Sequence, residues 1–478
     1  MPQPNIVLIM TDEMRGDCMG CAGHPDVQTP YLDHLAASGT YYPNAYSSCP
    51  SCVPARAVLH TGLSPEHAGR VGYQDQVDWN YGCTMAGELS KAGYYTQCVG
   101  KMHVHPLRNY LGFHNVELHD GYLHAYRRPD TAVFNWQLQA DDYFHWLRCQ
   151  MGADADLIAT GLDCNGWLAR PWPWAEKYHP TNWVADRSID FLRRRDPRKP
   201  FFLMTSFVRP HAPYDAPACY FDLYKDRPLR PPVKGDWDDR ELLDRTGSLF
   251  NNITGPKDPE QIRRQQIGYY ACISHMDNQI GRLLLALTEQ GLMENTIILF
   301  TSDHGEMLSD HCLDRKCVPY QGSIRIPMLV CKPRESQPGR VDDRLVELRD
   351  IMPTLLDYAG APIPAHLDGH SLEQPEARDY LRGEHSYGQK SNHFVVTKTD
   401  KFVWFSQTGE EQYFDLKNDP DETHNAIAEP KFRQRIDHLR QILIAELTGR
   451  EEGCSDGKQL IVGCQPLSVL SGAEAENC

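Results

Sequence analysis

The chain has 478 residues, of which 41% are hydrophobic, so it is long enough to bury a large core and to form about two domains. Its 64 acidic residues outnumber its 48 lysines and arginines, which gives a formal net charge of −16. This balance argues against nucleic acid as a partner, and it means that an anionic ligand must be attracted by local cations. No segment reaches about 18 consecutive apolar residues, which argues against a membrane span.

Two features bear on the cellular compartment. The start of the chain, MPQPNIVLIM, has neither the basic region nor the small-residue cleavage site of a signal peptide, so we expect a cytoplasmic protein. The 16 cysteines are scattered through a long chain. That distribution favours free thiols in a reducing compartment over a disulfide scaffold.

Four apolar runs rich in β-branched residues and bounded by turn residues predict buried strands. They are NIVLIM at 5–10, YYTQCV at 94–99, FFLMTSFV at 201–208 and TIILFTS at 296–302. Between these runs lie segments with helical periodicity, and several of them begin at a threonine and end at a glycine. The helical segments span residues 29–39, 84–93, 181–195 and 269–291. Strands that alternate with helices predict a doubly wound α/β fold with a mostly parallel sheet flanked by helices.

Beyond residue 370 this alternation gives way to shorter elements. Strand-like runs at 393–399 and 401–407 precede a predicted helix at 431–447. We therefore expect a large α/β domain over residues 1–370 and a smaller C-terminal α+β domain with a tail over residues 371–478.

Polar side chains follow each of the four predicted strands. In open α/β sheets, ligands bind beyond the carboxyl ends of the strands, so we expect these side chains to converge on one site. The alternative is that each of them, taken singly, is an ordinary polar loop residue. They are Asp12 and Glu13, Lys101 and His103, His211, and Asp303 and His304.

The cysteines of the segment SSCPSCVPARAVLHTG, residues 47–62, allow three interpretations. Cys49 and Cys52 form a CxxC pair and Cys18 and Cys21 form another, so the four could bind zinc, or one pair could be a redox dithiol. The 27 residues between the pairs contain a predicted helix and form a longer linker than zinc ribbons usually have.

The third interpretation uses the residues that follow Cys52. Pro54 suits the first turn of a helix, which would place Cys52 at the positive end of the helix dipole. Arg56 would add a fixed cation in the same turn. A nucleophile for an anionic substrate fits such a position.

At this point the sequence resembles the sulfatase family. CVPARAVLHTG matches the family pattern Cys-x-Pro-x-Arg followed by Leu-x-Thr-Gly. NIVLIMTDEMRGD, GKMH, RPHAPY, TSDHGE and DRKCVPYQGSIRIPMLV are similar to its other motifs. The resemblance covers roughly residues 4–430. It implies the alkaline-phosphatase-like fold, with the catalytic site in the large domain.

The resemblance also implies a mechanism. In this family a maturation enzyme oxidises the cysteine to formylglycine, whose hydrate attacks a small anionic sulfate ester of a phenol or sugar. The implied metal is Ca²⁺, although the imidazole ligand also suits Mn²⁺ or Mg²⁺. Its implied ligands are Asp12, Glu13, Cys52, Asp303 and His304.

The resemblance implies catalytic roles for Cys52, Arg56, Lys101, His103, His211 and Lys316. Both lysines would hold sulfate oxygens, and Arg56 would hold the formylglycine hydrate. His103 would assist the release of sulfate, and His211 would protonate the leaving alcohol.

Two departures from the family pattern keep an alternative open. The family often has Asp-Asp and Asp-Asn where this chain has Asp12-Glu13 and Asp303-His304. The Asp-His form resembles iduronate and choline sulfatases and also phosphonate monoester hydrolases, so a phosphonate monoester or phosphodiester hydrolase is the alternative. Lys101 and His103 favour sulfate. A non-catalytic binding protein of the same fold is a third hypothesis, against which the presence of Cys52, Lys101 and His211 argues.

Six of the nine tryptophans cluster in one region. They could line a pocket for an aromatic or sugar ring, or pack an insertion or a subunit interface. They are Trp136, Trp146, Trp167, Trp172, Trp174 and Trp183.

Overall fold

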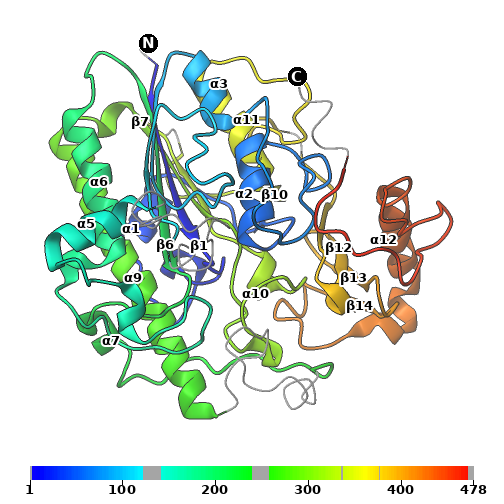
Figure 1. The fold of residues 1–478 in the computed structure, drawn as a ribbon. Helices are drawn as coiled ribbons and strands as arrows, with labels where there is room; N and C mark the ends of the chain where they lie inside the picture. Colours follow the sequence, from blue (N-terminus) through cyan, green and yellow to red (C-terminus); the bar gives the residue numbers. More distant parts are fainter. Residues whose placement is uncertain (1–2, 122–140, 239–257, 335–336, 376, 472–478) are drawn as a thin grey trace.

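A computed structural model describes residues 3–121, 141–238, 258–334, 337–375 and 377–471. Its central sheet lies between two layers of helices, and a smaller sheet lies beside it (Figure 1). The strand order in the central sheet is β5-β4-β6-β1-β7-β8-β2-β9. The bounds are β1 Asn5–Asp12, β2 Thr40–Tyr41, β4 Tyr95–Gly100, β5 Asn115–Leu118, β6 Phe201–Pro210, β7 Thr296–Ser302, β8 Met328–Cys331 and β9 Arg340–Val341.

The predicted mostly parallel sheet is confirmed. Strands β5, β4, β6, β1 and β7 run parallel to one another, and β8 pairs antiparallel with β7 and β2. The short strands β3 (Ala45–Tyr46) and β10 (Val346–Glu347) form a separate parallel pair.

The central strand β1 shows why its sequence is an uninterrupted apolar run. Alternate side chains of a strand point to opposite faces. Val7 and Ile9 pack in the core on one face of the sheet, whereas Ile6, Leu8 and Met10 pack in the core on the other. Because both faces are covered by helices, both sets must be apolar.

The two helical layers can be followed in Figure 1. On one face α1 (Pro30–Ser38), α6 (Pro180–Arg194) and α9 (Pro259–Glu289) pack together, with α5 (Asp142–Met151) and α7 (Ala218–Asp222) beside them. On the other face lie α2 (Cys52–Thr61), α3 (Met85–Lys91) and α11 (Ile351–Ala359), and α10 (Gln321–Ile324) lies near the C-terminal sheet.

Helix α9 begins ten residues earlier than its predicted start at 269, because Asp258 caps it at Pro259. The Asp258 side chain accepts hydrogen bonds from the backbone N–H groups of Glu260 and Gln261.

The C-terminal region forms the expected smaller α+β unit. Its antiparallel sheet comprises β11 (Leu381–His385), β12 (Asn392–Val396), β13 (Lys401–Phe405) and β14 (Glu411–Phe414), and α12 (Arg433–Glu446) packs against one face. The exact boundary at residue 370 stays a prediction. In the tail, Cys454 and Cys464 form a disulfide, so free thiols do not account for every cysteine.

None of the helices in the described ranges is both long and apolar enough to cross a membrane.

Gly100, the last residue of β4, permits a close approach between β4 and β6. Its φ is +103°, and a Cβ atom there would lie 1.9 Å from the carbonyl oxygen of Ser206. Gly93 has a similar φ of +95° but has nothing within 4 Å of a Cβ position. It is therefore a matched control for the backbone strain alone.

We expect Gly93→Ala to lower the free energy of unfolding by about 1 kcal/mol through strain. Gly100→Ala should cost about 3 kcal/mol, because the methyl group would also push the two strands apart. Urea unfolding of both variants measures the difference. Equal midpoints would show that β4 and β6 can separate at no cost.

Candidate active site

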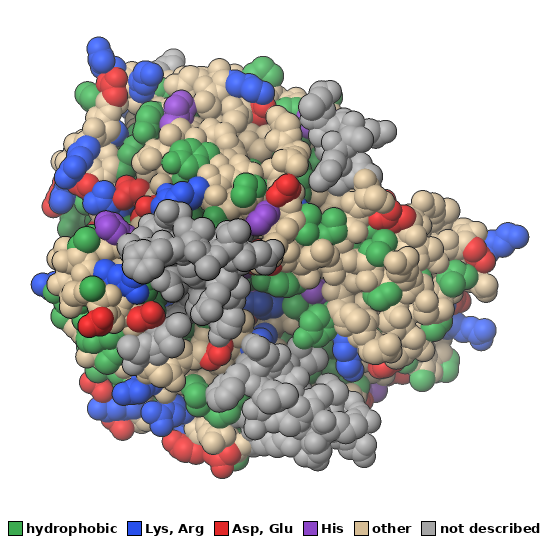
Figure 2. Space-filling view, in the orientation of Figure 1, with side chains coloured by type: hydrophobic (Ala, Val, Ile, Leu, Met, Phe, Trp, Pro, Cys, Tyr) green, Lys and Arg blue, Asp and Glu red, His purple; other side chains and the backbone are tan. Residues whose placement is uncertain are grey.

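The candidate site lies at the carboxyl ends of four adjacent strands, β4, β6, β1 and β7. Asp12 is the last residue of β1, and Lys101, His211 and Asp303 directly follow β4, β6 and β7. The structure brings these side chains together, as their positions after the strands predict. In Figure 2, Lys and Arg side chains lie recessed near the middle of this face, close to the C-terminal unit.

Cys52 is the first residue of α2 and is buried beside the strand ends. Its Sγ lies 3.3 Å from Nε2 of His304, 3.5 Å from Oδ1 of Asp12 and 3.8 Å from Nζ of Lys101. The preceding residue, Ser51, has its hydroxyl 2.8 Å from Nε2 of His385 in the C-terminal sheet. The predicted position of Cys52 at a helix N-terminus is therefore observed.

Four residues form a group that fits a metal ion. Asp12, Cys52, Asp303 and His304 each offer one ligand atom, and these atoms all lie within 4.8 Å of one another. Ligands about 2.4 Å from a Ca²⁺ ion are at most about 5 Å apart, so the spacing suits such an ion. All four residues are buried, which leaves the carboxylates in need of positive charge.

Arg56 is the fixed cation of the site. Its Nε donates to Oδ2 of Asp303 at 2.9 Å, and its Nη1 donates to the Lys101 carbonyl at 2.7 Å and to Oγ of Ser206 at 3.1 Å. The side chains of Arg56 and Asp303 are both fully buried. One guanidinium thus ties α2 to the middle of β6 and to the ends of β4 and β7.

Lys101 makes a short ion pair with Asp12. Burial opposes ionisation of Asp12, but Lys101 and the other cations around it hold its pKa well below the ordinary value. The Asp12 carboxylate is therefore charged and able to serve as a ligand.

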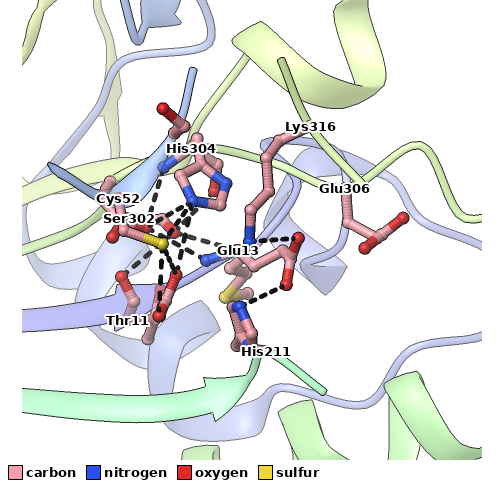
Figure 3. Close-up of polar contacts among 12 residues, drawn as sticks. Thr11, Glu13, Cys52, His211, Ser302, His304, Glu306 and Lys316 are labelled. Carbon is pink, nitrogen blue, oxygen red and sulfur yellow. Dashed lines mark hydrogen bonds and ion pairs between the residues drawn. The ribbon is translucent and has the colours of Figure 1, made fainter. Parts of the chain in front are cut away.

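Glu13 faces away from the four-residue group. Its Oε1 lies 2.9 Å from Nζ of Lys316, and its Oε2 lies 3.4 Å from Nε2 of His211 (Figure 3). A left-handed backbone conformation at Glu13, with φ of 69°, accompanies this orientation. Burial, opposed by Lys316, raises the pKa of Glu13 to about 7.

His103 follows Lys101 by two residues in the chain. Its backbone N–H donates to Oδ1 of Asp120 at 3.0 Å, and its ring is buried. Nε2 lies 3.9 Å from the Asp75 carboxylate, and the ring of Tyr73 approaches edge-on at 6.0 Å.

Two serines that position the site were not identified from the sequence. Ser302, at the end of β7, accepts from the Met14 N–H at 2.9 Å and donates to the His304 carbonyl at 3.0 Å. Ser206 accepts from Arg56 in the middle of β6. A serine within an otherwise apolar strand was the available signal for both.

The two CxxC pairs do not act together. Of their four cysteines, only Cys52 belongs to a potential metal-ligand group in the part of the chain that the structure describes. Cys18 packs in the apolar core beside α1, and Cys49 is fully buried.

The tryptophans mostly pack the helical layer. Trp172 and Trp183, the latter within α6, belong to the core on this side of the sheet, and Trp146 and Trp174 pack against it. Trp167 lines a small cavity that Glu13 also borders. Trp136 lies outside the described residues.

The family model described as sulfatase matches residues 4–361, which is most of the chain. The chain belongs to the sulfatase family. A second model, the C-terminal region of N-sulphoglucosamine sulphohydrolase, matches residues 309–448. This sulfatase is therefore an enzyme that hydrolyses sulfate esters.

Individual relatives agree with the family. An arylsulfatase of Clostridium perfringens is 52% identical over 477 residues, covering 98% of this chain and 99% of the relative. A choline-sulfatase of Rhizobium meliloti is 29% identical and covers 90% of this chain and 83% of the relative. The crystal structure of a phosphonate monoester hydrolase of Agrobacterium radiobacter matches the fold with a TM-score of 0.75 at 24% identity, covering 93% of this chain and 95% of that one.

The four-residue group leads to a prediction about metal removal. Treatment with a chelator should lower the melting temperature, and added Ca²⁺ should restore it, because a ligand that binds only the folded state stabilises it. At a Ca²⁺ concentration 100 times the Kd, the gain is about 2.7 kcal/mol.

Asp303→Asn should abolish the response to Ca²⁺ in the same thermal unfolding assay. Asp342→Asn, at the far edge of the sheet after β9, is the control and should keep it. A response that survives Asp303→Asn would place the ion elsewhere.

Proposed function

We propose that this sulfatase hydrolyses an aryl or carbohydrate sulfate monoester to an alcohol and sulfate, with residue 52 converted from cysteine to formylglycine by a maturation enzyme. The observation that carries the proposal is the position of Cys52. Its sulfur lies at the N-terminus of α2, within 3.8 Å of His304, Asp12 and Lys101. The arylsulfatase that is 52% identical supports an aryl ester.

The conversion to formylglycine allows sulfate to be released from the nucleophile. A serine or cysteine nucleophile would remain esterified by sulfate, whereas an aldehyde hydrate has a second hydroxyl that allows sulfate to be expelled. Arg56 is suited to hold this hydrate, because its buried Nη2 has no hydrogen-bond partner among the described residues.

Asp12, Asp303, His304 and residue 52 would hold the metal, which we propose is Ca²⁺, with Mn²⁺ or Mg²⁺ also compatible with the donors. Such an ion supplies positive charge that stabilises developing negative charge on oxygen. We assign Glu13 instead to orienting Lys316 and His211, with which its carboxylate makes contact.

The remaining groups are suited to the sulfate and the leaving alcohol. Lys101 and Lys316 bring two ammonium groups to the site from β4 and from the loop after β7, where they would hold sulfate oxygens. His211 would give a proton to the departing oxygen, and His103 would assist the release of sulfate from residue 52.

The mass of the tryptic peptide spanning residues 16–56 tests the modification. From cells with a working maturation system, we expect residue 52 to carry an aldehyde, and Cys52→Ala should abolish turnover. Cys49→Ala changes the neighbouring thiol and should retain turnover. A peptide that contains only thiol in a fully active preparation would contradict the mechanism.

Paired substrates test the class of ester. We expect 4-nitrophenyl sulfate to be hydrolysed with a higher kcat/KM than a 4-nitrophenyl phosphodiester. The two esters share the leaving group and a single negative charge, and they differ in the central atom and in the second ester group of the phosphodiester. A clear preference for the phosphodiester would favour phosphonate monoester or phosphodiester hydrolysis instead.

A further inference from the structure

His211 lies on a seven-residue segment, 209–215, whose two ends are joined by a buried ion pair. Nε of Arg209 donates to Oδ1 of Asp215 at 2.7 Å, and Nη2 donates to Oδ2 at 2.7 Å. Both side chains are 1% exposed. A guanidinium that binds a carboxylate through two parallel hydrogen bonds fixes both distance and orientation.

Asp215 is in turn anchored to helix α6. Nε2 of His179 lies 3.2 Å from Oδ1 of Asp215, and Nδ1 of His179 accepts from the Thr181 N–H at 3.1 Å at the start of α6. The ring of Trp172 packs edge-on against His179 at 4.8 Å. The carboxylate is therefore held from both sides.

The backbone on either side of His211 is also fixed. The N–H of His211 donates to the Asp12 carbonyl at 3.0 Å, and the N–H of Arg170 donates to the Tyr214 carbonyl at 3.0 Å. Nδ1 of His211 lies 2.8 Å from the Ala212 carbonyl. With Nδ1 bonded to its own segment, Nε2 is the nitrogen that faces Glu13 and the site.

We propose that Arg209 and Asp215 are positioning residues, which close this segment so that Nε2 of His211 is held where the departing alcohol oxygen forms. This inference rests on the proposed function. A buried ion pair contributes little net stability, because removing its charges from water costs about as much as their attraction returns. Net stability therefore does not explain why the pair is present, whereas orienting His211 does.

The step that His211 serves determines how the pair can be tested. When the S–O bond to the alcohol breaks, the electron pair stays on the alcohol oxygen. Because Nδ1 keeps its hydrogen for the Ala212 carbonyl, His211 must enter this step as the imidazolium, give the Nε2 proton to the alcohol oxygen and leave as the neutral imidazole. A weakly acidic phenol develops more negative charge than an acidic one and depends more on that proton. Misplacing His211 should therefore slow esters of weakly acidic phenols most.

The experiment measures kcat/KM for a series of aryl sulfates whose phenols differ in acidity, from 4-nitrophenyl sulfate to phenyl sulfate. In Asp215→Asn we expect kcat/KM for phenyl sulfate to fall by about tenfold more than kcat/KM for 4-nitrophenyl sulfate. General acid catalysis accelerates such a step by about 10²–10⁴-fold, so a misplaced acid can lose a tenfold part of it. Arg209→Lys keeps the charge but not the paired hydrogen bonds. It should likewise make kcat/KM depend more steeply on the acidity of the phenol.

Asp342→Asn is the matched control, because Asp342 makes a similar two-bond pair with Arg344 at the far edge of the sheet. We expect it to leave the dependence on the phenol unchanged. Partial unfolding lowers all rates alike, so the ratio between substrates reports on the folded enzyme.

One outcome would overturn the role of the Arg209–Asp215 pair, and a different outcome would overturn the proposed function. If Asp215→Asn and Arg209→Lys slow every aryl sulfate by the same factor, the pair is structural only and the inference fails. If the enzyme without substitutions hydrolyses none of the aryl sulfates but cleaves phosphodiesters, the proposed function fails instead.

Discussion

The ion pair between Arg56 and Asp303 joins a helix to a strand end at a place with no solvent exposure. Neither charge could be buried there alone, because an isolated buried ion costs several kcal/mol. The same guanidinium also binds the Lys101 carbonyl and Ser206, so it fixes the ends of β4 and β7 and the middle of β6 around Cys52. The rest of the site depends on this arrangement, in which oppositely charged side chains from α2 and from the ends of β1, β4 and β7 balance one another.

Strand order is what makes the arrangement possible. Residues separated by nearly 300 positions, such as Asp12 and Asp303, become neighbours because β1 pairs with β7 in parallel register. The phosphonate monoester hydrolase structure shares this fold at 24% identity. The fold therefore does not distinguish sulfate from phosphonate esters, and the discrimination belongs to the side chains beyond the strands.

Much of this could be predicted from the sequence, because it follows from local patterns. Mainly apolar runs bounded by turn residues indicated the four central strands, and Pro54 indicated the helix that begins at Cys52. The orientation of Glu13 could not be predicted, since it depends on a left-handed turn and on Lys316 far along the chain. The Arg209–Asp215 pair lies within one segment, but nothing in a loop sequence specifies that its two ends meet.

The most direct measurement compares preparations in which different fractions of residue 52 carry the aldehyde, each assayed with 4-nitrophenyl sulfate. If Cys52 supplies the nucleophile only after oxidation, specific activity should rise in proportion to the aldehyde fraction and extrapolate to zero at none. Full activity in a preparation whose residue 52 is entirely thiol would contradict the account.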